Sequence, residues 1–134
     1  MASAKRIKTF TVELQHKPGA LAQVMGTFRE QKVNTIGTWS WAQKDNKAYV
    51  IFIGDNAGKT EEALKNNGLS YTAADACLCE CDDRLGVFYD TLQKAAKAGV
   101  NLHAAYAVGT AGKCAYVLWA EEGQHSKLCQ ALGC

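Results

Sequence analysis

The sequence predicts an α+β fold made of two copies of one βαββαβ unit with an antiparallel sheet, because its landmarks occur twice. Residues 16–21 join an alternating apolar run to a helical run, and residues 83–88 do the same at an offset of 67. At this offset Val33-Asn34 returns as Val100-Asn101, and the tripeptide Ala48-Tyr49-Val50 also returns. Landmarks retained at one period indicate a duplicated unit.

The duplication divides the 134 residues into repeat 1, residues 6–73, and repeat 2, residues 74–134. A composition of 48% apolar and 21% charged residues is typical of a globular chain. A unit of this size hides only about 60% of the surface that its unfolded chain exposes. We therefore expect the repeats to pack against each other or against a second copy of the chain.

Hydrophobic periodicity assigns the elements of repeat 1. Residues 6–15 alternate as a strand, and residues 20–31 carry a helical apolar stripe after a Pro-Gly turn. Residues 33–42 and 48–53 form a predicted hairpin, and the second strand is apolar enough to be central in the sheet. A helix is expected to begin at Thr60, with acidic residues in its first turn, and to end before Gly68.

Repeat 2 follows the same order until its end. The extended run at residues 69–81 is long enough to hold the last strand of repeat 1 and the first strand of repeat 2. A helix at 87–98, strands at 102–108 and 114–120 and a helix at 125–132 come next. The second unit is therefore truncated, and its sheet edge is left short, covered by the last helix or completed by another chain. An uncovered edge invites association, so we expect a homodimer.

Trp39 and Trp41 lie on one face of the second strand, and the matching positions Tyr106 and Val108 are also apolar. Aromatic side chains at such a place are typical of an interface between copies.

The motif of repeat 1 resembles that of the ACT domain, a small ferredoxin-like regulatory module that commonly binds amino acids in metabolic enzymes and regulators. The resemblance rests on Lys17-Pro18-Gly19-Ala20-Leu21 after a strand, a twelve-residue helix, and Val33-Asn34 at the start of the next strand. It covers nearly the whole chain as a tandem pair. Repeat 2 departs from the motif because Leu85 replaces the proline.

The resemblance also implies a ligand site, because in similar domains the first loop of one copy meets the second strand of its partner copy. One site would have His16, Lys17, Pro18, Gly19 and Ala20 facing Asn101. The reciprocal site would have Asp83, Arg84, Leu85, Gly86 and Val87 facing Asn34.

Physical chemistry agrees with an anionic ligand group at the first loop. Gly19 opens a helix, whose unpaired N–H groups and positive dipole end attract a carboxylate. Asn34 and Asn101 can donate and accept hydrogen bonds. Asp83 would repel a carboxylate, so we expect the His16 loop to bind and the Asp83 loop to be weaker or empty. The alternative is that Pro-Gly is only a turn and each asparagine only a helix cap.

Cys77, Cys79 and Cys81 point to one face of a strand and correspond to the apolar positions of residues 10–14. Buried cysteine is a small hydrophobe, so core packing is the first interpretation. A thiol-based metal or redox site with Cys114 as a fourth sulfur is the alternative. The Cys-x2-Cys knuckles of zinc sites are absent, and Cys129 and Cys134, near the end of the sequence, are interpreted as incidental.

Several function classes are disfavoured by the sequence. A net charge of +2 does not suggest nucleic acid, no apolar run reaches the ~18 residues that span a bilayer, and no signal-peptide pattern is present. We therefore expect a cytoplasmic protein with reduced thiols and no membrane partner. His16, His103 and His125 show no metal spacing, and no catalytic set or cofactor motif is signalled.

These observations predict a regulatory protein without catalytic activity that binds a small molecule, with an amino acid as the expected ligand class, at the junction between its repeats. A metabolic enzyme or regulator is a candidate partner, and no cofactor is expected. The thiol-based metal or redox protein is the first alternative, and a purely structural dimerisation module is the second.

Overall fold

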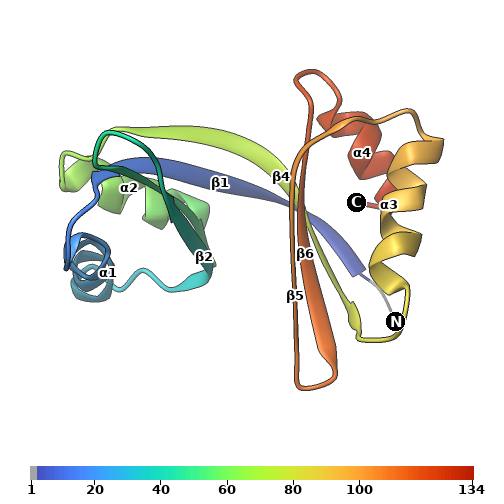
Figure 1. The fold of residues 1–134 in the computed structure, drawn as a ribbon, viewed down its shortest axis with the longest axis horizontal. Helices are drawn as coiled ribbons and strands as arrows, with labels where there is room; N and C mark the ends of the chain where they lie inside the picture. Colours follow the sequence, from blue (N-terminus) through green and yellow to red (C-terminus); the bar gives the residue numbers. More distant parts are fainter. Residues whose placement is uncertain (1–2) are drawn as a thin grey trace. The chain divides into compact units, whose positions relative to one another are not determined.

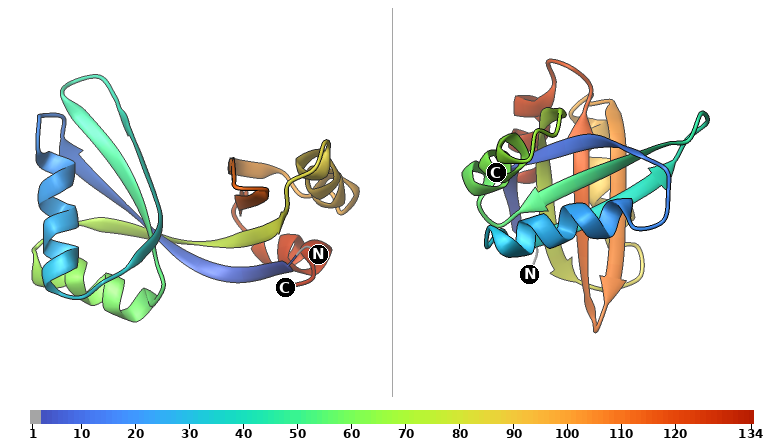
Figure 2. Two further views of the ribbon diagram at one scale, coloured as in Figure 1. Left: turned by 90° about the horizontal axis from the view of Figure 1, so that it is seen from below. Right: turned by 90° about the vertical axis from the view of Figure 1, so that its left-hand side faces the viewer.

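A computed structural model describes residues 3–134 and divides the chain into two compact units. The N-terminal unit is Lys8–Ala74, and the C-terminal unit joins Asp75–Cys134 with residues 3–7. Two long strands, β1 (Ser3–Gln15) and β4 (Tyr71–Asp82), are hydrogen-bonded neighbours, as both views show (Figure 1, Figure 2). Each of these strands contributes residues to both units.

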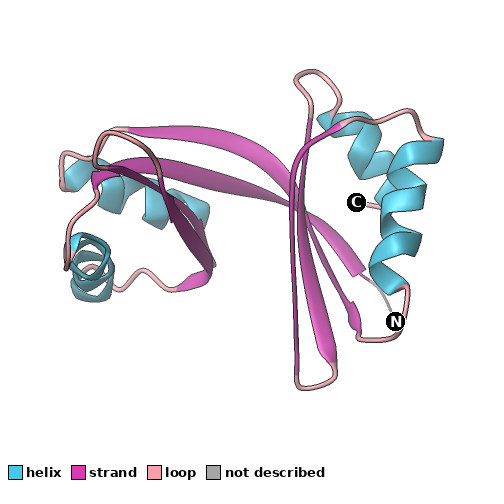
Figure 3. Cartoon of the chain, in the orientation of Figure 1, coloured by secondary structure: helices cyan, strands magenta, loops and turns pink. Residues whose placement is uncertain are grey.

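In the N-terminal unit the strand order is β2-β3-β1-β4, with β3 antiparallel to both of its neighbours. Two helices cover one face of this sheet (Figure 3). This is the split arrangement predicted from the sequence. The elements between β1 and β4 are α1 (Ala20–Glu30), β2 (Thr35–Ala42), β3 (Lys47–Gly54) and α2 (Ala57–Asn66).

The C-terminal unit repeats this order with β1-β4-β6-β5, and its two helices pack together on one face of the sheet (Figure 3). Its elements after β4 are α3 (Val87–Lys97), β5 (Leu102–Thr110), β6 (Lys113–Ala120) and α4 (His125–Leu132). Residues 3–7 belong to this unit, and Ala4 packs against its core. The start of β1 therefore takes the place of a fourth strand after α4. The sheet edge beside β4, which the sequence analysis expected to be short, covered or completed by another chain, is occupied by β1 of the same chain.

Several strand starts differ from the predicted ones by one to three residues, β1 beginning at Ser3 rather than at residue 6, and two element starts differ for a reason visible in local hydrogen bonds. Helix α2 begins at Ala57 rather than Thr60, because the Asn56 side chain accepts a hydrogen bond from the Lys59 N–H at 3.0 Å and caps the helix earlier. Strand β2 begins at Thr35 rather than Val33. Val33 completes the end of α1 instead, because its N–H donates to the Phe28 carbonyl at 2.8 Å.

Strand β3 of the N-terminal unit matches strand β6 of the C-terminal unit at an offset of 66 residues, whereas the earlier elements match at 67. Phe52 lies opposite Phe10, and Leu118 lies opposite Cys77. The turn between β5 and β6 is shorter than that between β2 and β3, which removes one residue from repeat 2. A shift of one residue reverses the face of every side chain in a strand. Tyr116 is consequently buried, whereas Tyr49 is only half-buried, and the two tyrosines are not equivalent.

The two cores differ in chemistry. The N-terminal unit packs aromatic rings, and the Phe28 and Phe52 centroids lie 4.9 Å apart in an edge-on arrangement. In the C-terminal unit the positions that match Phe10, Val12 and Leu14 are Cys77, Cys79 and Cys81, which are all buried, as predicted for core residues. Within residues 3–134 no helix is both long and apolar enough to cross a bilayer.

Candidate functional site

The loop of residues 16–20 connects β1 to α1 through a fixed backbone geometry. The N–H of His16 donates to the Asn46 carbonyl at 2.7 Å and ties the loop to the β2–β3 turn. Gly19 has φ = 86°, the left-handed conformation that glycine adopts without steric cost. Its carbonyl accepts from the Gln23 N–H at 2.9 Å, so Gly19 is the N-cap of α1.

The loop of residues 83–87 repeats this geometry before α3. The N–H of Asp83 donates to the Gly112 carbonyl at 2.9 Å, and the Gly86 carbonyl accepts from the Asp90 N–H at 3.0 Å. Gly86 has φ = 84° and is the N-cap of α3. Leu85, which replaces the proline of repeat 1, is fully exposed and leaves the loop unchanged. The two loops are the same backbone with different side chains.

Two hollows border the loop of residues 16–20 within the N-terminal unit. The first lies between the end of β1 and the β2–β3 turn and contains groups of both charges: Glu13, His16, Lys17, Asp45 and Lys47, together with Leu14, Gln15 and Asn46. The second hollow, of about 270 Å³, lies between α1 and the residues that follow α2. Its lining includes Lys17 and Ala20. Pro18 and Gly19 are exposed.

The loop of residues 83–87 borders a smaller hollow of about 220 Å³ within the C-terminal unit. Arg84 Nη2 lies 3.2 Å from Asp90 Oδ2, and Asp90 occupies the first turn of α3. A carboxylate is therefore already present at the positive end of this helix, where a ligand carboxylate would compete with it. Gln23 stands at the matching position of α1 and carries no charge.

Asn34 and Asn101 occupy matching exposed positions just before β2 and β5. The Asn34 carbonyl accepts from the Asp55 N–H at 3.0 Å, and the Asn101 carbonyl accepts from the Glu121 N–H at 2.9 Å. The Asn101 N–H donates to Gln124 Oε1 at 2.9 Å. Each asparagine lies in the same unit as the loop of its own repeat, and its pairing with the loop of the other repeat stays a prediction.

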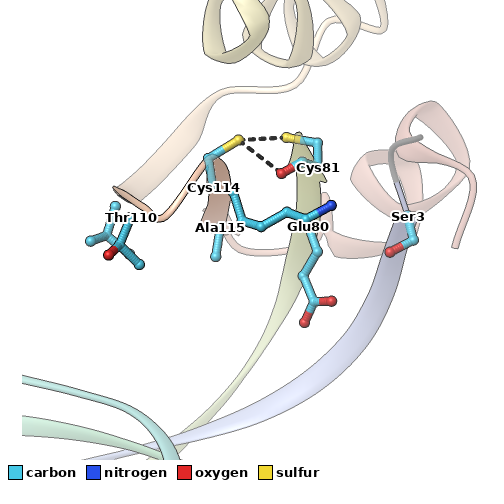
Figure 4. A pocket seen from close by; sticks show the side chains of 8 residues that line it. Ser3, Glu80, Cys81, Thr110, Cys114 and Ala115 are labelled. Atoms are coloured by element: carbon cyan, nitrogen blue, oxygen red, sulfur yellow. Dashed lines mark hydrogen bonds between the residues drawn. The ribbon is translucent and has the colours of Figure 1, made fainter. Parts of the chain in front are cut away.

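The cysteines of β4 do not form one site with Cys114. Cys81 lies opposite Cys114 on β6, and their sulfurs are 2.8 Å apart (Figure 4). Four residues of strand span about 13 Å, so Cys77 and Cys81 cannot ligate one ion together. The sulfur of Cys77 lies instead beside Cys129, at 3.1 Å. The predicted alternative of one metal or redox site built from Cys77, Cys79, Cys81 and Cys114 is therefore wrong, because the sulfurs lie too far apart along the strand.

The Cys81–Cys114 pair lines a cavity of about 440 Å³ in the C-terminal unit, and Figure 4 shows the two sulfurs facing each other. The Tyr116 hydroxyl lies 3.2 Å from the Cys114 sulfur. Burial raises the pKa of the Cys114 thiol, and burial also raises the pKa of Cys79, to about 11. Raised pKa values keep these thiols protonated, and protonated thiols are poor nucleophiles. The pKa values therefore do not favour thiol catalysis here.

Sequence reasoning missed that His125, Cys129 and Cys134 gather around Cys77. The signal that could have found them is His125-x3-Cys129 within a predicted helix, since residues four apart lie on one helical face.

No family model matches the chain, and no curated protein does either. Solved structures do match. Protein BT0572 from Bacteroides thetaiotaomicron has a TM-score of 0.84 at 19% identity, with 97% of this chain and 88% of that chain covered. The ligand-free regulatory subunit of aspartate kinase from Thermus thermophilus has a TM-score of 0.69 at 14% identity, with 98% and 94% covered. The corresponding subunit from Thermus flavus has a TM-score of 0.68 at 13% identity, also with 98% and 94% covered.

Likeness at these identities establishes the fold. The fold class predicted from the sequence is confirmed by the match with the aspartate kinase regulatory subunits. The chain is thus similar over nearly its whole length to regulatory subunits.

Proposed function

We propose that this protein is a regulatory protein without catalytic activity that binds a small-molecule effector, an amino acid, through the loop of residues 16–20. The observation that carries the proposal is the exposed helix start at Gly19. Its left-handed backbone ends a tethered loop, and a Cβ placed on it would meet no atom within 4 Å. The Ala20 N–H already donates to the Lys17 carbonyl at 3.3 Å, so a carboxylate would approach the N–H groups that follow it in the first turn of α1.

The side chains around this helix start suit a zwitterion. Lys17 and His16 add positive or polar character beside the N-terminus of α1, while Glu13 and Asp45 line the same hollow and can attract an ammonium group. Asn101, contributed by the other repeat, would donate and accept hydrogen bonds. Asn34 would serve the reciprocal site in the same way.

The loop of residues 83–87 would bind more weakly. Asp83 and Asp90 place two carboxylates at the start of α3, and Arg84 is already paired with Asp90. Because the two loops have the same backbone conformation, the charges of their side chains would determine which loop binds the ligand and which stays empty.

Regulation would follow if binding at a junction between repeats favours one orientation of the repeats. The similarity to aspartate kinase regulatory subunits supports a metabolic enzyme or a regulator as the partner of a cytoplasmic protein. A homodimer through the strand that carries Trp39 and Trp41 would provide further junctions. Trp41 is exposed at 40% and stacks on Tyr49 at a centroid distance of 6.0 Å.

Calorimetric titration with the twenty amino acids tests the proposal. At least one should bind the parent protein, and Gly19→Asp should abolish binding because it adds a negative charge at the helix start. Gly86→Asp is the matched control, since Gly86 has the same left-handed backbone and also has open space around a Cβ. It should leave binding unchanged. If none of the twenty amino acids gives a binding signal, a purely structural dimer would be favoured. If both variants lose amino-acid binding equally, the assignment of the site would be contradicted.

A further inference from the structure

Four side chains with soft or borderline metal-ligand atoms meet in the C-terminal unit. Cys77 Sγ on β4 lies 3.1 Å from Cys129 Sγ on α4 and 3.5 Å from Cys134 Sγ. His125 Nε2 lies 3.4 Å from Cys129 Sγ. The ligand atoms of Cys77, His125 and Cys129 all lie within 4.8 Å of one another. A set of three sulfurs and one imidazole is typical of a structural zinc site.

The distances are close to those of a tetrahedral ion. Bonds of about 2.3 Å to sulfur and about 2.0 Å to nitrogen place two sulfurs about 3.8 Å apart and a sulfur and a nitrogen about 3.5 Å apart. The observed separations of 3.1, 3.5 and 3.4 Å need an outward movement of a few tenths of an ångström. Cys134 contacts Cys77 and lies outside the group of three whose ligand atoms are all within 4.8 Å of one another, so its side chain must move further than the other three to complete the tetrahedron.

Local structure holds each ligand in place. His125 and Cys129 are four residues apart on α4, so their side chains share one helical face. Gly133, with φ = 86°, reverses the chain after α4, and the Cys134 N–H donates to the Cys129 carbonyl at 2.8 Å. This helix-ending turn returns Cys134 to the Cys129 side of the helix. Cys77 approaches from β4, where it is fully buried.

The surroundings favour a bound cation over free thiolates. Cys77 and Cys129 are completely buried, so an uncompensated thiolate would be costly there. Arg6 on β1 lies close enough to Cys134 for its positive charge to act on that thiol. A divalent ion with three thiolates and a neutral imidazole carries one net negative charge, which Arg6 would offset. Each thiol would release its proton to solvent as its metal bond forms.

We propose that Cys77, His125, Cys129 and Cys134 bind one zinc-class divalent metal ion that ties α4 to β4 in the C-terminal unit. Four protein ligands leave no open position, so the ion has a structural role. The proposal stands apart from the amino-acid site, whose residues it does not use.

The Cys81–Cys114 pair provides an internal control. Its sulfurs are also in contact, but the third polar group beside them is the Tyr116 hydroxyl, and no histidine within residues 3–134 joins them. Two thiols and a phenol do not make a closed zinc site. Substitution there removes a buried sulfur without touching the proposed ligands.

Titration of the full reduced chain with cobalt(II), after treatment with a chelator, tests the site. We expect one equivalent to give thiolate-to-cobalt charge-transfer bands and tetrahedral d–d bands, both removed by zinc. Cys129→Ser and the less buried His125→Ala should each weaken cobalt binding at least about tenfold. Cys114→Ser should bind as the parent does, within about twofold.

Three outcomes would overturn the proposal. The first is a reduced parent protein without charge-transfer bands. The second is equal loss of binding in Cys129→Ser and Cys114→Ser. The third is a Cys77–Cys129 disulfide found by mass spectrometry in the purified protein, with no metal uptake after reduction. The parent titration decides the question even if a variant does not fold, and circular dichroism checks the variants.

Discussion

The two units share one backbone but fill it with different cores. The position of Phe10 in the N-terminal unit is that of Cys77 in the C-terminal unit, and the position of Phe28 is that of Ala95. All four side chains are buried at 1% exposure or less. Rings have thus been replaced by small groups, and the space beside β4 is taken by α4 with its Leu128 and Cys129.

At the position of Phe10 the C-terminal unit has a sulfur in place of a ring, while its own aromatic pair, Phe88 and Tyr116, packs elsewhere in the unit with centroids 4.6 Å apart. Thiols can bind metal or form disulfides, whereas phenyl rings can only pack. The stability of the C-terminal unit should therefore respond to metal and redox state, and that of the N-terminal unit should not. Substitutions that exchange residues between equivalent positions test this contrast.

The largest effect is expected for Phe28→Ala, which gives the N-terminal unit the residue that the C-terminal unit has at Ala95. Phe28 packs edge-on against Phe52, and α2, the helix of this unit that corresponds to α4, already contributes Ala63 and Leu64 to the same core, so a cavity should remain. The loss of unfolding free energy should be about 3–5 kcal/mol. Urea unfolding of a Trp119→Phe background, followed by Trp39 and Trp41 fluorescence, measures it. A loss below about 1 kcal/mol would mean that the aromatic core is not needed.

The reverse exchange, Cys77→Phe, should also destabilise, because the sulfurs of Cys129 and Cys134 already occupy the space around Cys77. Overpacking of this kind costs about 1–3 kcal/mol. Unfolding of a background in which Trp39 and Trp41 are replaced by phenylalanine, followed by Trp119 fluorescence in the presence of a chelator, separates packing from metal binding. Cys79→Val, which installs the residue found at Val12, is the control and should cost less than about 1.5 kcal/mol. A stabilising Cys77→Phe would contradict the contrast between the cores.

Much of the fold could be predicted because its signals are local. Helix α4 was expected at residues 125–132 and is found there, and α1 and α3 differ from their predicted ends by one residue. Apolar periodicity and glycine stops determine these elements. The start of α2 was missed because Asn56 competed with Thr60 as the cap, and both residues are good N-caps.

The other errors have long-range causes. Residues 3–7 carry little strand propensity, and their place in the C-terminal unit depends on a β4 strand about seventy residues away. The one-residue shift between β3 and β6 comes from a shorter turn, which an offset counted along the chain does not reveal. Cys129 and Cys134 approach Cys77 only through packing of α4 on the sheet. The ligand loops and the distinguishing charge of Asp83 were predicted from the sequence, but the ion pair of Arg84 with Asp90 needed coordinates.

A smaller effect is expected at the second helix of each unit. Helix α2 is capped by the Asn56 side chain, whereas the N-cap of α4, Gln124, makes no capping hydrogen bond with its side chain. Asn56→Ala should therefore lower the unfolding free energy of the N-terminal unit by about 1 kcal/mol. Asn56→Asp keeps the acceptor and should restore most of the loss, as urea unfolding can measure. If both variants behave alike, the cap does not stabilise α2.

The smallest effect concerns the far ends of β4 and β6. Lys113 Nζ donates to Asp82 Oδ1 across the strands, whereas the equivalent position opposite Lys47 is the uncharged Gln15. The hydrogen bond from Lys113 lowers the pKa of Asp82, and the same contact raises the pKa of Lys113. A carboxyl whose pKa is lowered by folding stabilises the protein above its unfolded pKa, and this contribution is lost as the pH falls through the folded value. A lysine whose pKa is raised loses its contribution only at alkaline pH.

Asp82→Asn should therefore lower the melting temperature slightly at pH 7, and the difference from the parent should shrink as the pH falls below about 4. Added salt should reduce it as well, because both side chains are exposed and exposed pairs are screened. Thermal melts at neutral and acidic pH, with and without salt, measure these differences. Gln15→Asp, which creates the same pair opposite Lys47, should raise the melting temperature at pH 7 under the same conditions. A difference that persists at acidic pH would assign the effect of Asp82 to its backbone position, and the two sheet ends would then differ in shape rather than charge.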